Sequence, residues 1–325
     1  MEIKLLTSDF KLIGIIDNPK SLTYTECFSD AGTLYMEVDF SRELYAILKP
    51  PCRILIEDLI FNVDKLWLQN GVIRVYASGI FAEFKQFYIS MPEQQSGSAA
   101  DILYSFASRA SFDGITYKVF GIGSEDTRVC ESYEWCSDLY TIINQLCYDY
   151  SLGFRIIYSF EAQELRFHLL DTRDRATNQA SVYTVISDRL GTYSSIESVD
   201  DVTNYKNTIE LIYRINALGE LVSLTYNRRP PNESVRGLAV YPFIMPKDET
   251  ELYNMYATCA AKLFKDHRRK RYFNVTIAAD AKYRVGDICF FESLELGERH
   301  YALLTERKVE LIDTVPVETV TLEVQ

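Results

Sequence analysis

Short runs of β-branched and aromatic residues, each closed by turn-forming residues, dominate the first ninety positions of this chain. The first four runs are EIKLLT, KLIGII, SLTYTECFS and GTLYMEVDF, and the residues between them are Ser-Asp, Asp-Asn-Pro and Asp-Ala-Gly. β-Branched and aromatic residues favour extended backbone, whereas Asp, Asn, Pro and Gly supply the dihedral angles and local hydrogen bonds of turns. The pattern therefore predicts a meander of antiparallel strands.

The meander is expected to contain one small helix and one tight hairpin. Ser41 can cap the helix RELYAIL, which Pro50 and Pro51 must end, because proline disfavours helical backbone in the residue before it. RILIED, FNVDKLWL and VIRVYASG follow as strands, and Asn70-Gly71 is a strong signal for a two-residue hairpin turn. Residues 1–94 are accordingly predicted to form a first β-barrel-like domain.

From about residue 97 the spacing of apolar residues changes from two to three or four, which indicates helices. One set lies at 99, 102, 103, 106, 107 and 110 behind a possible Ser98 cap, and a second lies at 139, 142, 143, 146 and 147 before Gly153. Each helix is followed by strand-like runs, namely ITYKVFG after the first and GFRIIYS with ELRFHLLD after the second. Residues 95–175 are therefore predicted to form a small α+β domain.

Strand-like runs return in residues 176–325, which are predicted to form a second β-barrel-like domain. An inserted helix at about 248–267 interrupts them, with acidic residues in its first turn and basic ones at its end, as the helix dipole favours. The predicted fold class is mainly β, with two barrel-like β domains flanking a small α+β domain. No repeat at the level of individual residues is visible between the two β domains.

Composition and charge restrict the possible partners. The chain has 325 residues, 46 acidic against 34 basic side chains, and a formal net charge of −12, which disfavours nonspecific binding to nucleic acid or to an anionic membrane. The first residues have neither a basic leader nor a continuous apolar stretch, so neither a signal peptide nor a membrane anchor is expected. We therefore expect folding in a cytoplasm and no stable membrane association.

Residues with catalytic or ligand-binding chemistry are scattered. The seven cysteines form no C-x-x-C pair and are expected to be ordinary thiols; they are Cys27, Cys52, Cys130, Cys136, Cys147, Cys259 and Cys289. His168 is expected to be structural, and neither it nor His267 or His300 has a second ligand at metal-binding spacing. No hydrolase, zinc or phosphate-loop motif is present. Catalytic, cofactor-binding and metal-binding residues are accordingly predicted to be absent, and no cofactor is expected.

Three charged clusters need separate interpretations. Asp200-Asp201 and Asp171-Thr172-Arg173-Asp174-Arg175 could supply paired carboxylates for glycoside hydrolysis, but solvated turns between strands explain them better. The basic run Lys265-Asp266-His267-Arg268-Arg269-Lys270-Arg271 precedes Tyr272-Phe273 and could face nucleic acid. A solvated helix end or a subunit contact is the interpretation we favour for this run.

Three segments of the chain have a characteristic pattern. The first is the opening, Glu2 to Val38, with its I-G-I-I-D strand; the second is Asp200 to Ile209, with Tyr205-Lys206-Asn207 before a strand. The third runs from Tyr283-x-Val285-Gly286-Asp287-Ile288 to Leu304-Thr305-Glu306-Arg307-Lys308-Val309. In the third segment, Gly permits unusual dihedral angles and Asp can bond back to the backbone, which suits a tight turn before a barrel strand. The three segments resemble the tail-hub proteins of tailed bacteriophages and related particles, which include baseplate hubs and siphophage tail-tip proteins.

The resemblance implies a structural, non-enzymatic hub at the virion tail tip or baseplate, assembled in the host bacterial cytoplasm. It implies a homotrimeric ring that joins a sixfold tail tube to a threefold tip and leaves a channel for DNA in transit. The implied partners are a distal tail or tail-tube protein, a tape-measure protein, and a tip spike or receptor-binding protein. An appended enzyme is not expected, because the chain stops at Gln325 in a predicted strand. The alternatives are a tail-associated cell-wall hydrolase and a carbohydrate-binding adsorption module.

Overall fold

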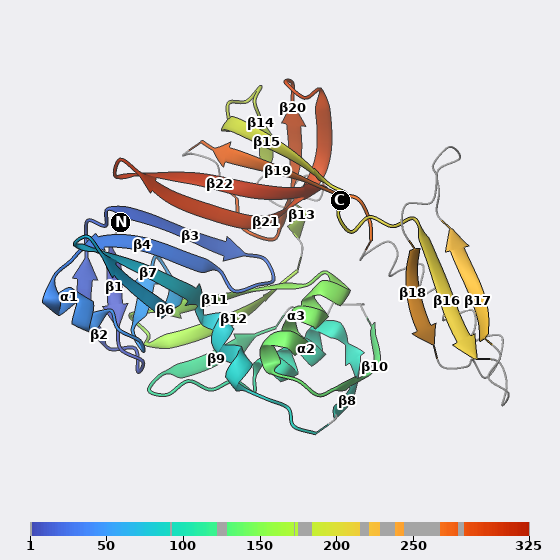
Figure 1. Cartoon of the computed structure of the whole chain (residues 1–325), viewed down its shortest axis with the longest axis horizontal. Helices are drawn as coiled ribbons and strands as arrows, with labels where there is room; N and C mark the ends of the chain where they lie inside the picture. The colour runs from blue at the N-terminus through green and yellow to red at the C-terminus, as the bar shows by residue number, and fades with distance from the viewer. Residues whose placement is uncertain are drawn as a thin grey trace. The chain divides into compact units, whose positions relative to one another are not determined.

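The computed structural model describes residues 2–91, 93–121, 129–171, 173–174, 184–214, 221–227, 238–243, 267–278 and 283–324 (Figure 1). The chain divides into a larger unit, Met1–Ile196 with Asn274–Glu323, and a smaller unit, Glu197–Phe273. Strands far outnumber helices among the described elements, so the predicted mainly β fold class with a small α+β part is confirmed.

The N-terminal part of the larger unit is the predicted meander with one short helix. Alternation along the strands puts apolar side chains inside; in β4, for example, Leu34, Met36 and Val38 are buried and the residues between them are not. Ser41 caps the helix, and its Oγ accepts a hydrogen bond from Leu44 N at 3.0 Å. The elements are β1 (Ile3–Leu6), β2 (Leu12–Ile16), β3 (Ser21–Cys27), β4 (Thr33–Asp39), α1 (Arg42–Ile47), β5 (Arg53–Ile56), β6 (Leu59–Gln69) and β7 (Val72–Gly79).

The predicted Asn-Gly hairpin is confirmed. Asn70 and Gly71 join β6 to β7 with φ angles of 53° and 76°, the left-handed values that a two-residue hairpin turn of this kind requires at both positions. Glycine adopts this conformation without strain, and asparagine tolerates it better than most residues. The local sequence thus specified both the position and the geometry of this turn.

The predicted α+β part follows, with two more strands than expected. Its elements are η1 (Ile80–Gln86), β8 (Glu93–Ser98), α2 (Ala99–Ala107), β9 (Thr116–Phe120), β10 (Val129–Trp135), α3 (Leu139–Tyr150), β11 (Gly153–Ser159) and β12 (Glu164–Leu170). β9 lies parallel to β12, which pairs antiparallel with β11. The helices bury their predicted apolar faces in a core that also contains Leu6, Phe10 and Leu55 from the meander. One continuous core therefore joins the two parts.

The end of α3 differs from the prediction. Ser151, not Gly153, takes the left-handed conformation that closes the helix, with a φ angle of 53°. Gly153 instead begins β11, where the absence of a side chain leaves space for Phe28. The periodicity marked the apolar face correctly but did not locate the residue that ends the helix.

The C-terminal part of the larger unit is again built of strands. They are β13 (Arg173–Asp174), β14 (Val185–Ser187), β15 (Tyr193–Asp201), β19 (Lys270–Ile277), β20 (Asp287–Ser293), β21 (Glu298–Ile312) and β22 (Val315–Val324). The last residues of β15 and the first of β19 belong to the smaller unit, which also contains β16 (Thr208–Arg214), β17 (Leu221–Asn227) and β18 (Leu238–Phe243). The helix predicted at about 248–267 lies outside the described residues, except for its last position.

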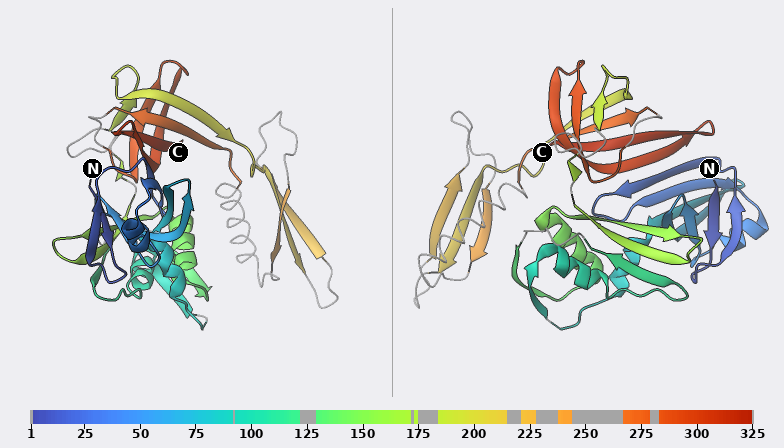
Figure 2. Two further views of the ribbon diagram at one scale, coloured as in Figure 1. Left: turned by 60° about the vertical axis from the view of Figure 1, so that its left-hand side comes forward. Right: turned by 180° about the vertical axis from the view of Figure 1, so that it is seen from behind.

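One strand connects the C-terminal strands to the N-terminal meander. The outer half of β21 pairs antiparallel with β3, from Glu306 opposite Cys27 to Glu310 opposite Thr23. The resulting sheet has the order β15-β19-β22-β21-β3-β4-β7-β6-β5-β1-β2, with β20 alongside β21 and β13 and β14 alongside β20. Figure 2 shows the β21–β22 hairpin running along β3. The three predicted domain boundaries stay predictions, because a single sheet passes between the two β parts.

Candidate functional site

The three histidines occupy three different elements. His168 lies on β12 with its ring stacked on Phe120, the centroids 4.7 Å apart, and burial lowers the pKa of its imidazole. His300 Nε2 contacts Glu298 Oε2 at 2.9 Å, and His267 Nδ1 lies 3.1 Å from Asn204 O. No group of three or more His, Cys, Asp or Glu among the described residues could hold a metal ion. None of the described helices has the length and apolar character needed to cross a membrane.

The acidic pair and the basic run meet in the smaller unit. Arg269 Nε donates to Asp200 Oδ1 at 2.6 Å, and this hydrogen bond lowers the pKa of Asp200. Asp201 Oδ1 accepts from Thr203 N at 2.8 Å, in the manner of an Asx turn. These contacts give the two carboxylates structural partners. Residues 265 and 266 of the basic run, and most of the run from Asp171 to Arg175, lie outside the described side chains.

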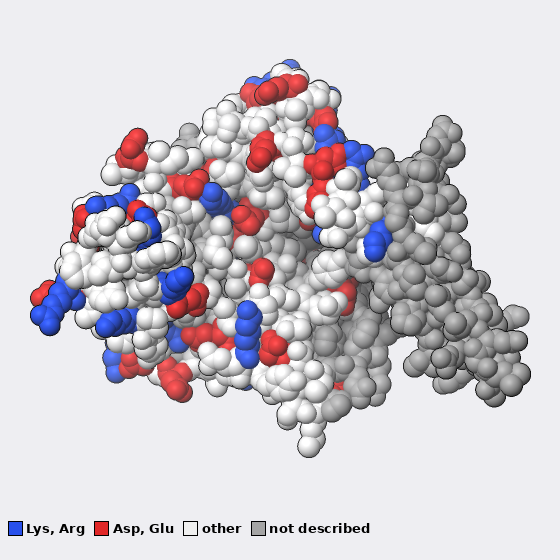
Figure 3. Space-filling model, viewed as in Figure 1, with Lys and Arg blue, Asp and Glu red and all other residues white. Residues whose placement is uncertain are grey.

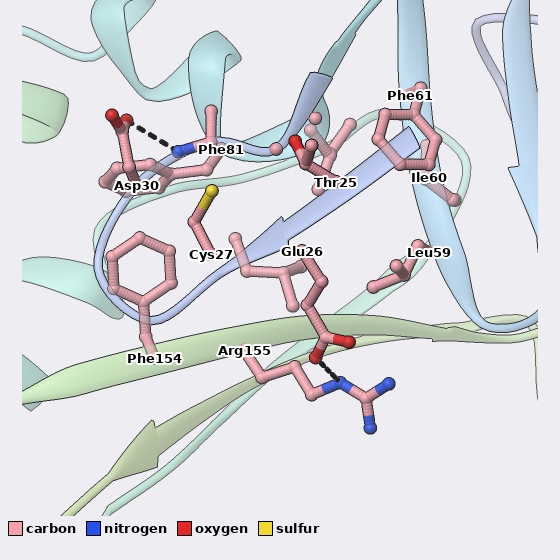
Figure 4. A pocket seen from close by; sticks show the side chains of 15 residues that line it. Thr25, Glu26, Cys27, Asp30, Leu59, Ile60, Phe61, Phe81, Phe154 and Arg155 are labelled. Carbon is pink, nitrogen blue, oxygen red and sulfur yellow. Dashed lines mark hydrogen bonds and ion pairs between the residues drawn. The ribbon is translucent and has the colours of Figure 1, made fainter. Parts of the chain in front are cut away.

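A small cavity lies between the end of β3 and β11 (Figure 4). Its volume is about 50 Å³, and its lining includes Cys27, Asp30, Phe81 and Phe154. Ligand pockets usually measure about 300–1,000 Å³, so this cavity has room for water rather than a substrate. Burial, followed by the nearby Glu306 and Asp30 carboxylates, raises the pKa of the Cys27 thiol to about 12. Cys27 is therefore a neutral thiol at physiological pH, unsuited to nucleophilic attack.

Phe28, which follows β3 in the N-terminal part of the larger unit, is hydrogen-bonded to both the α+β part and the C-terminal part. Its N–H donates to Thr305 O of β21 at 2.9 Å, and its carbonyl accepts from Phe154 N of β11 at 2.9 Å. Two glycines leave space for its side chain: a Cβ on Gly153 would lie 2.3 Å from Phe28 Cε2, and one on Gly286 would lie 2.9 Å from the same atom. We call these three residues the Phe28 junction.

The Phe28 junction explains the Gly-Asp pair at the start of β20. Gly286 has a φ angle of 92° and donates its N–H to Leu304 O at 2.8 Å. Asp287 Oδ2 accepts from Arg284 N at 2.9 Å, so the carboxylate bonds back to the backbone as the sequence predicted. The pair thus makes a tight turn and, in addition, brings backbone against an aromatic ring more than 250 positions earlier, a contact that the sequence did not indicate.

A network of charged side chains surrounds Arg307 of β21, close to the Phe28 junction. Arg307 Nη1 contacts Glu57 Oε2 at 3.1 Å, and its Nη2 contacts Glu318 Oε1 at 2.9 Å. Glu26 lies 3.9 Å from Arg307 and forms a 2.6 Å ion pair with Arg155 of β11, which Figure 4 shows. The remaining members are Asp58, 3.1 Å from Arg155 Nη2, and Tyr283, whose hydroxyl donates to Glu318. We call this set the Arg307 network.

The network contains partly buried charges whose pKa values reflect their surroundings. Burial opposes the charge of Arg307, but hydrogen bonds to Glu318 and Glu57 outweigh it and raise the Arg307 pKa. The same bond from Arg307 holds the pKa of Glu318 below its ordinary value. Burial raises the pKa of Glu26, against the opposing effect of Arg155 and Arg307. The network therefore ties β3, the β5–β6 turn, β11, β21 and β22 together through fixed charges.

Glu318 and Glu26 are expected to respond in opposite ways to acid. Because the folded-state pKa of Glu318 lies below 4.5, its stabilisation is present above pH 4.5 and is lost as the pH falls through that folded-state value. Glu318→Gln should lower the free energy of unfolding at pH 7 by about 1–3 kcal/mol, the usual cost of removing a charged hydrogen-bond partner. The difference from wild type should shrink in acid.

Glu26→Gln is the matched comparison. The folded-state pKa of Glu26 lies above 4.5, so its contribution is fully present below pH 4.5 and is lost as the pH rises through the folded-state value. A neutral amide cannot show this loss, so the free energy of unfolding of the variant should rise relative to that of wild type as the pH rises. Urea denaturation of the three proteins across the acid range measures both trends. Parallel pH profiles for the two variants would contradict the assignment.

Comparison with solved structures places this geometry in a known fold. Neither protein-family models nor curated proteins match the sequence. A prophage tail protein, gp18, from Listeria monocytogenes EGD-e is similar over 99% of this chain and 94% of its own, with a TM-score of 0.59 at 15% identity. A tail protein from Neisseria meningitidis MC58 is similar over 99% of this chain and 95% of its own, with a TM-score of 0.60 at 9% identity.

A third similar structure is the 43 kDa tail protein of prophage MuSo2 from Shewanella oneidensis, with 99% of this chain and 98% of that one covered, a TM-score of 0.58 and 12% identity. Each of the three similarities covers nearly the whole length of both chains, so it is not limited to one shared domain. The resemblance predicted from the sequence is therefore confirmed at the level of the fold: this chain has the fold of these phage tail proteins.

Proposed function

We propose that this protein is a structural, non-enzymatic hub of a phage tail or phage-tail-like particle. Three copies form a ring at the tail tip or baseplate, join a sixfold tube to a threefold tip, and leave a channel through which DNA passes. The observation that supports this most strongly is the likeness to three tail proteins, two of them from prophages, over 94–98% of their own lengths. The tail-tube, tape-measure and tip proteins are the partners that follow from this role.

The Phe28 junction and the Arg307 network give such a hub a mechanical basis. A ring that transmits force between a tube and a tip needs its β parts fixed to each other, and β21 crosses from one part to the other by pairing with β3. Side chains from β3, the β5–β6 turn and β22 then contact Arg307 and Arg155 beside that crossing. In this role the site couples the parts of the subunit to each other and carries out no reaction.

The distribution of charge suits a channel wall better than a stable DNA-binding surface. The net charge is −12, and acidic and basic side chains alternate over the face shown in Figure 3 without a large basic patch among its described residues. Stable binding to DNA depends on clustered Lys and Arg that neutralise phosphates. A protein with these surface properties would let DNA pass without holding it.

The hydrolase alternative is less well supported by the described carboxylates. A larger hollow of about 410 Å³ is lined by Glu2, Lys4, Tyr24, Leu55, Glu57, Val309, Pro316 and Glu318. Glycoside hydrolysis needs one carboxyl group with a raised pKa to act as general acid. In this hollow Glu57 and Glu318 both bind Arg307, and the pKa of Glu318 is lowered. The geometry thus favours a structural role for both residues.

Electron microscopy of the purified protein, with two-dimensional classification at low and high concentration, tests the proposal. We expect ring-shaped particles with threefold symmetry and a central hole. Mass photometry of the same samples should show a species of three chains, each of 37.5 kDa. Compact monomers at every concentration, together with clearing of peptidoglycan suspensions by the purified protein, would contradict the structural hub and favour the hydrolase.

A further inference from the structure

The hollow of about 410 Å³ lies where the start of the chain meets the β21–β22 hairpin (Figure 1). Its lining comes from the first residues of the chain, β3, β5, the β5–β6 turn, β21 and β22, all within the larger unit. This volume falls in the range of ligand pockets, about 300–1,000 Å³. The hollow therefore has room for a bound group such as one long side chain. We call it the Tyr24 hollow, after the buried residue in its lining.

Tyr24 gives the hollow a polar group that the fold itself does not satisfy. The residue is 1% exposed, and its hydroxyl is buried without a hydrogen-bond partner among the described residues. Burial, followed by the nearby Glu57 carboxylate, raises the pKa of this hydroxyl, so the group stays neutral and can both donate and accept. A buried polar atom without a partner costs stability and is rare in folded proteins. A bound group with an N–H donor would satisfy it.

The lining carries more negative than positive charge. Three carboxylates line the hollow, those of Glu2, Glu57 and Glu318, against one ammonium group, that of Lys4. Lys4 lies 3.3 Å from Glu2, and the other two carboxylates contact Arg307, so three negative charges meet two positive ones. A carboxylate can accept about four hydrogen bonds, so these three retain free acceptor sites. Because their side chains are 34–52% exposed, a further cation can reach them from solvent.

Apolar side chains complete the lining of the Tyr24 hollow. They are Leu55, Val309 and Pro316. Lysine and arginine side chains pack their aliphatic stems on apolar surface while the charged group stays in polar surroundings. The hollow offers both surfaces side by side, an apolar wall for a stem and carboxylates with a hydroxyl for a cationic head. The net charge of −12 also favours the approach of a basic partner.

We propose that the Tyr24 hollow receives a lysine or arginine side chain from an extended segment of another tail protein. The cationic group donates hydrogen bonds to the Tyr24 hydroxyl and to the carboxylates of Glu2 and Glu57. This proposal rests on the hub role proposed above, since a hub binds other tail proteins, and it names the chemistry of one such contact. The Arg307 network then has a second use, because Arg307 fixes Glu57 and Glu318 at the hollow.

Capped tripeptides test this chemistry on the full-length protein. The probes are a Gly-Arg-Gly and a Gly-Lys-Gly peptide, each acetylated and amidated. Their counterparts with citrulline and norleucine keep the side-chain stem and remove the charge. Saturation-transfer NMR titrations measure binding. We expect the two basic peptides to bind, with an affinity that falls as salt is added, and the neutral peptides to bind at least about tenfold more weakly.

Two variants test the position of the bound group. Tyr24→Phe removes only a hydroxyl without a partner, so it should keep the stability of wild type and weaken binding of the basic peptides about tenfold. Glu2→Gln should weaken it about two- to fivefold, as for an exposed charge pair. Glu310→Gln is the matched control and should leave binding unchanged, because Glu310 pairs with Lys308 two positions away, as Glu2 does with Lys4, but does not line the hollow.

Several results would overturn this contact. They are no binding of either basic peptide to wild type, equal binding of charged and neutral peptides, and undiminished binding to both Tyr24→Phe and Glu2→Gln. Tighter binding of putrescine, a free diamine, than of either peptide would show that the hollow takes a small amine and would overturn the protein partner. None of these results affects the threefold rings, so the hub would stand. A wild type without rings would remove the hub and, with it, the tail-protein partner.

Discussion

Gly153→Ala is expected to destabilise the larger unit by more than about 3 kcal/mol, beyond the usual range for added methyl groups in a core. The new Cβ would lie 2.3 Å from Phe28 Cε2 and 2.4 Å from Phe28 O, and the second of these atoms belongs to the backbone. Rotation of the Phe28 side chain cannot relieve that contact. The carbonyl is also fixed by its hydrogen bond with Phe154 N at 2.9 Å, so β11 and β3 would have to separate.

Urea denaturation and hydrogen exchange measure this effect. Gly71→Ala is the control, because a Cβ there meets nothing within 4 Å, and only the left-handed φ angle of 76° costs about 1–2 kcal/mol. Amides of β3 and β11 should lose protection in Gly153→Ala and keep it in Gly71→Ala. Equal losses of stability in the two variants would show that the approach of Phe28 to position 153 costs no more than replacing an ordinary left-handed glycine, and would contradict the prediction.

Arg307→Leu is expected to lower the free energy of unfolding by about 3–5 kcal/mol, the typical cost of removing one partner from a buried ion pair. The Arg307 side chain is 15% exposed and contacts Glu57 and Glu318. Its removal would leave two carboxylates close together, with Glu26 nearby, and no guanidinium between them. Leucine fills part of the volume but supplies no hydrogen-bond donor, so the carboxylates would repel each other.

The neighbouring residue provides the control for this variant. Lys308 is 39% exposed and pairs with Glu310 on the same strand, so Lys308→Leu should change stability by no more than about 1 kcal/mol. Arg307→Lys separates charge from geometry, because lysine keeps the charge but cannot bind two carboxylates in the fork arrangement of arginine. Chemical denaturation at pH 7 measures the free energy of unfolding of Arg307→Leu, Arg307→Lys and Lys308→Leu. A loss in Arg307→Leu as small as in Lys308→Leu would mean that the network contributes little to holding the strands together.

The sequence predicted those features that depend on neighbouring residues. Alternation identified the strands and their buried faces, Ser41 was placed correctly as a helix cap, and Asn70-Gly71 specified its hairpin turn. Asp287 was expected to bond back to the backbone, and it does. Each of these outcomes is fixed by contacts within a few positions along the chain, so a short stretch of sequence contains the information needed to predict it.

The site could not be predicted in the same way. Phe28 meets Gly153 and Gly286, and Arg307 meets Glu57, through pairings between β3, β11 and β21 that join distant segments. Nothing in the sequence near Arg307 distinguishes it from the exposed Lys308 beside it. The two β parts also share an order of strands, β3-β4-β7-β6-β5 and β15-β19-β22-β21-β20, which the sequence did not show because they have no common pattern of residues.

The amino-acid sequence by itself determined which segments are strands, which faces they bury and where the tight turns lie, since alternation and turn chemistry act locally. Only the tertiary structure decided that β21, a strand of the C-terminal part, pairs with β3 of the N-terminal part, and that Phe28 and Arg307 lie beside this pairing. Any strand with an apolar face and an open edge satisfies the local requirements for pairing. The choice among such strands depends on packing and burial over the whole larger unit, which no short segment encodes.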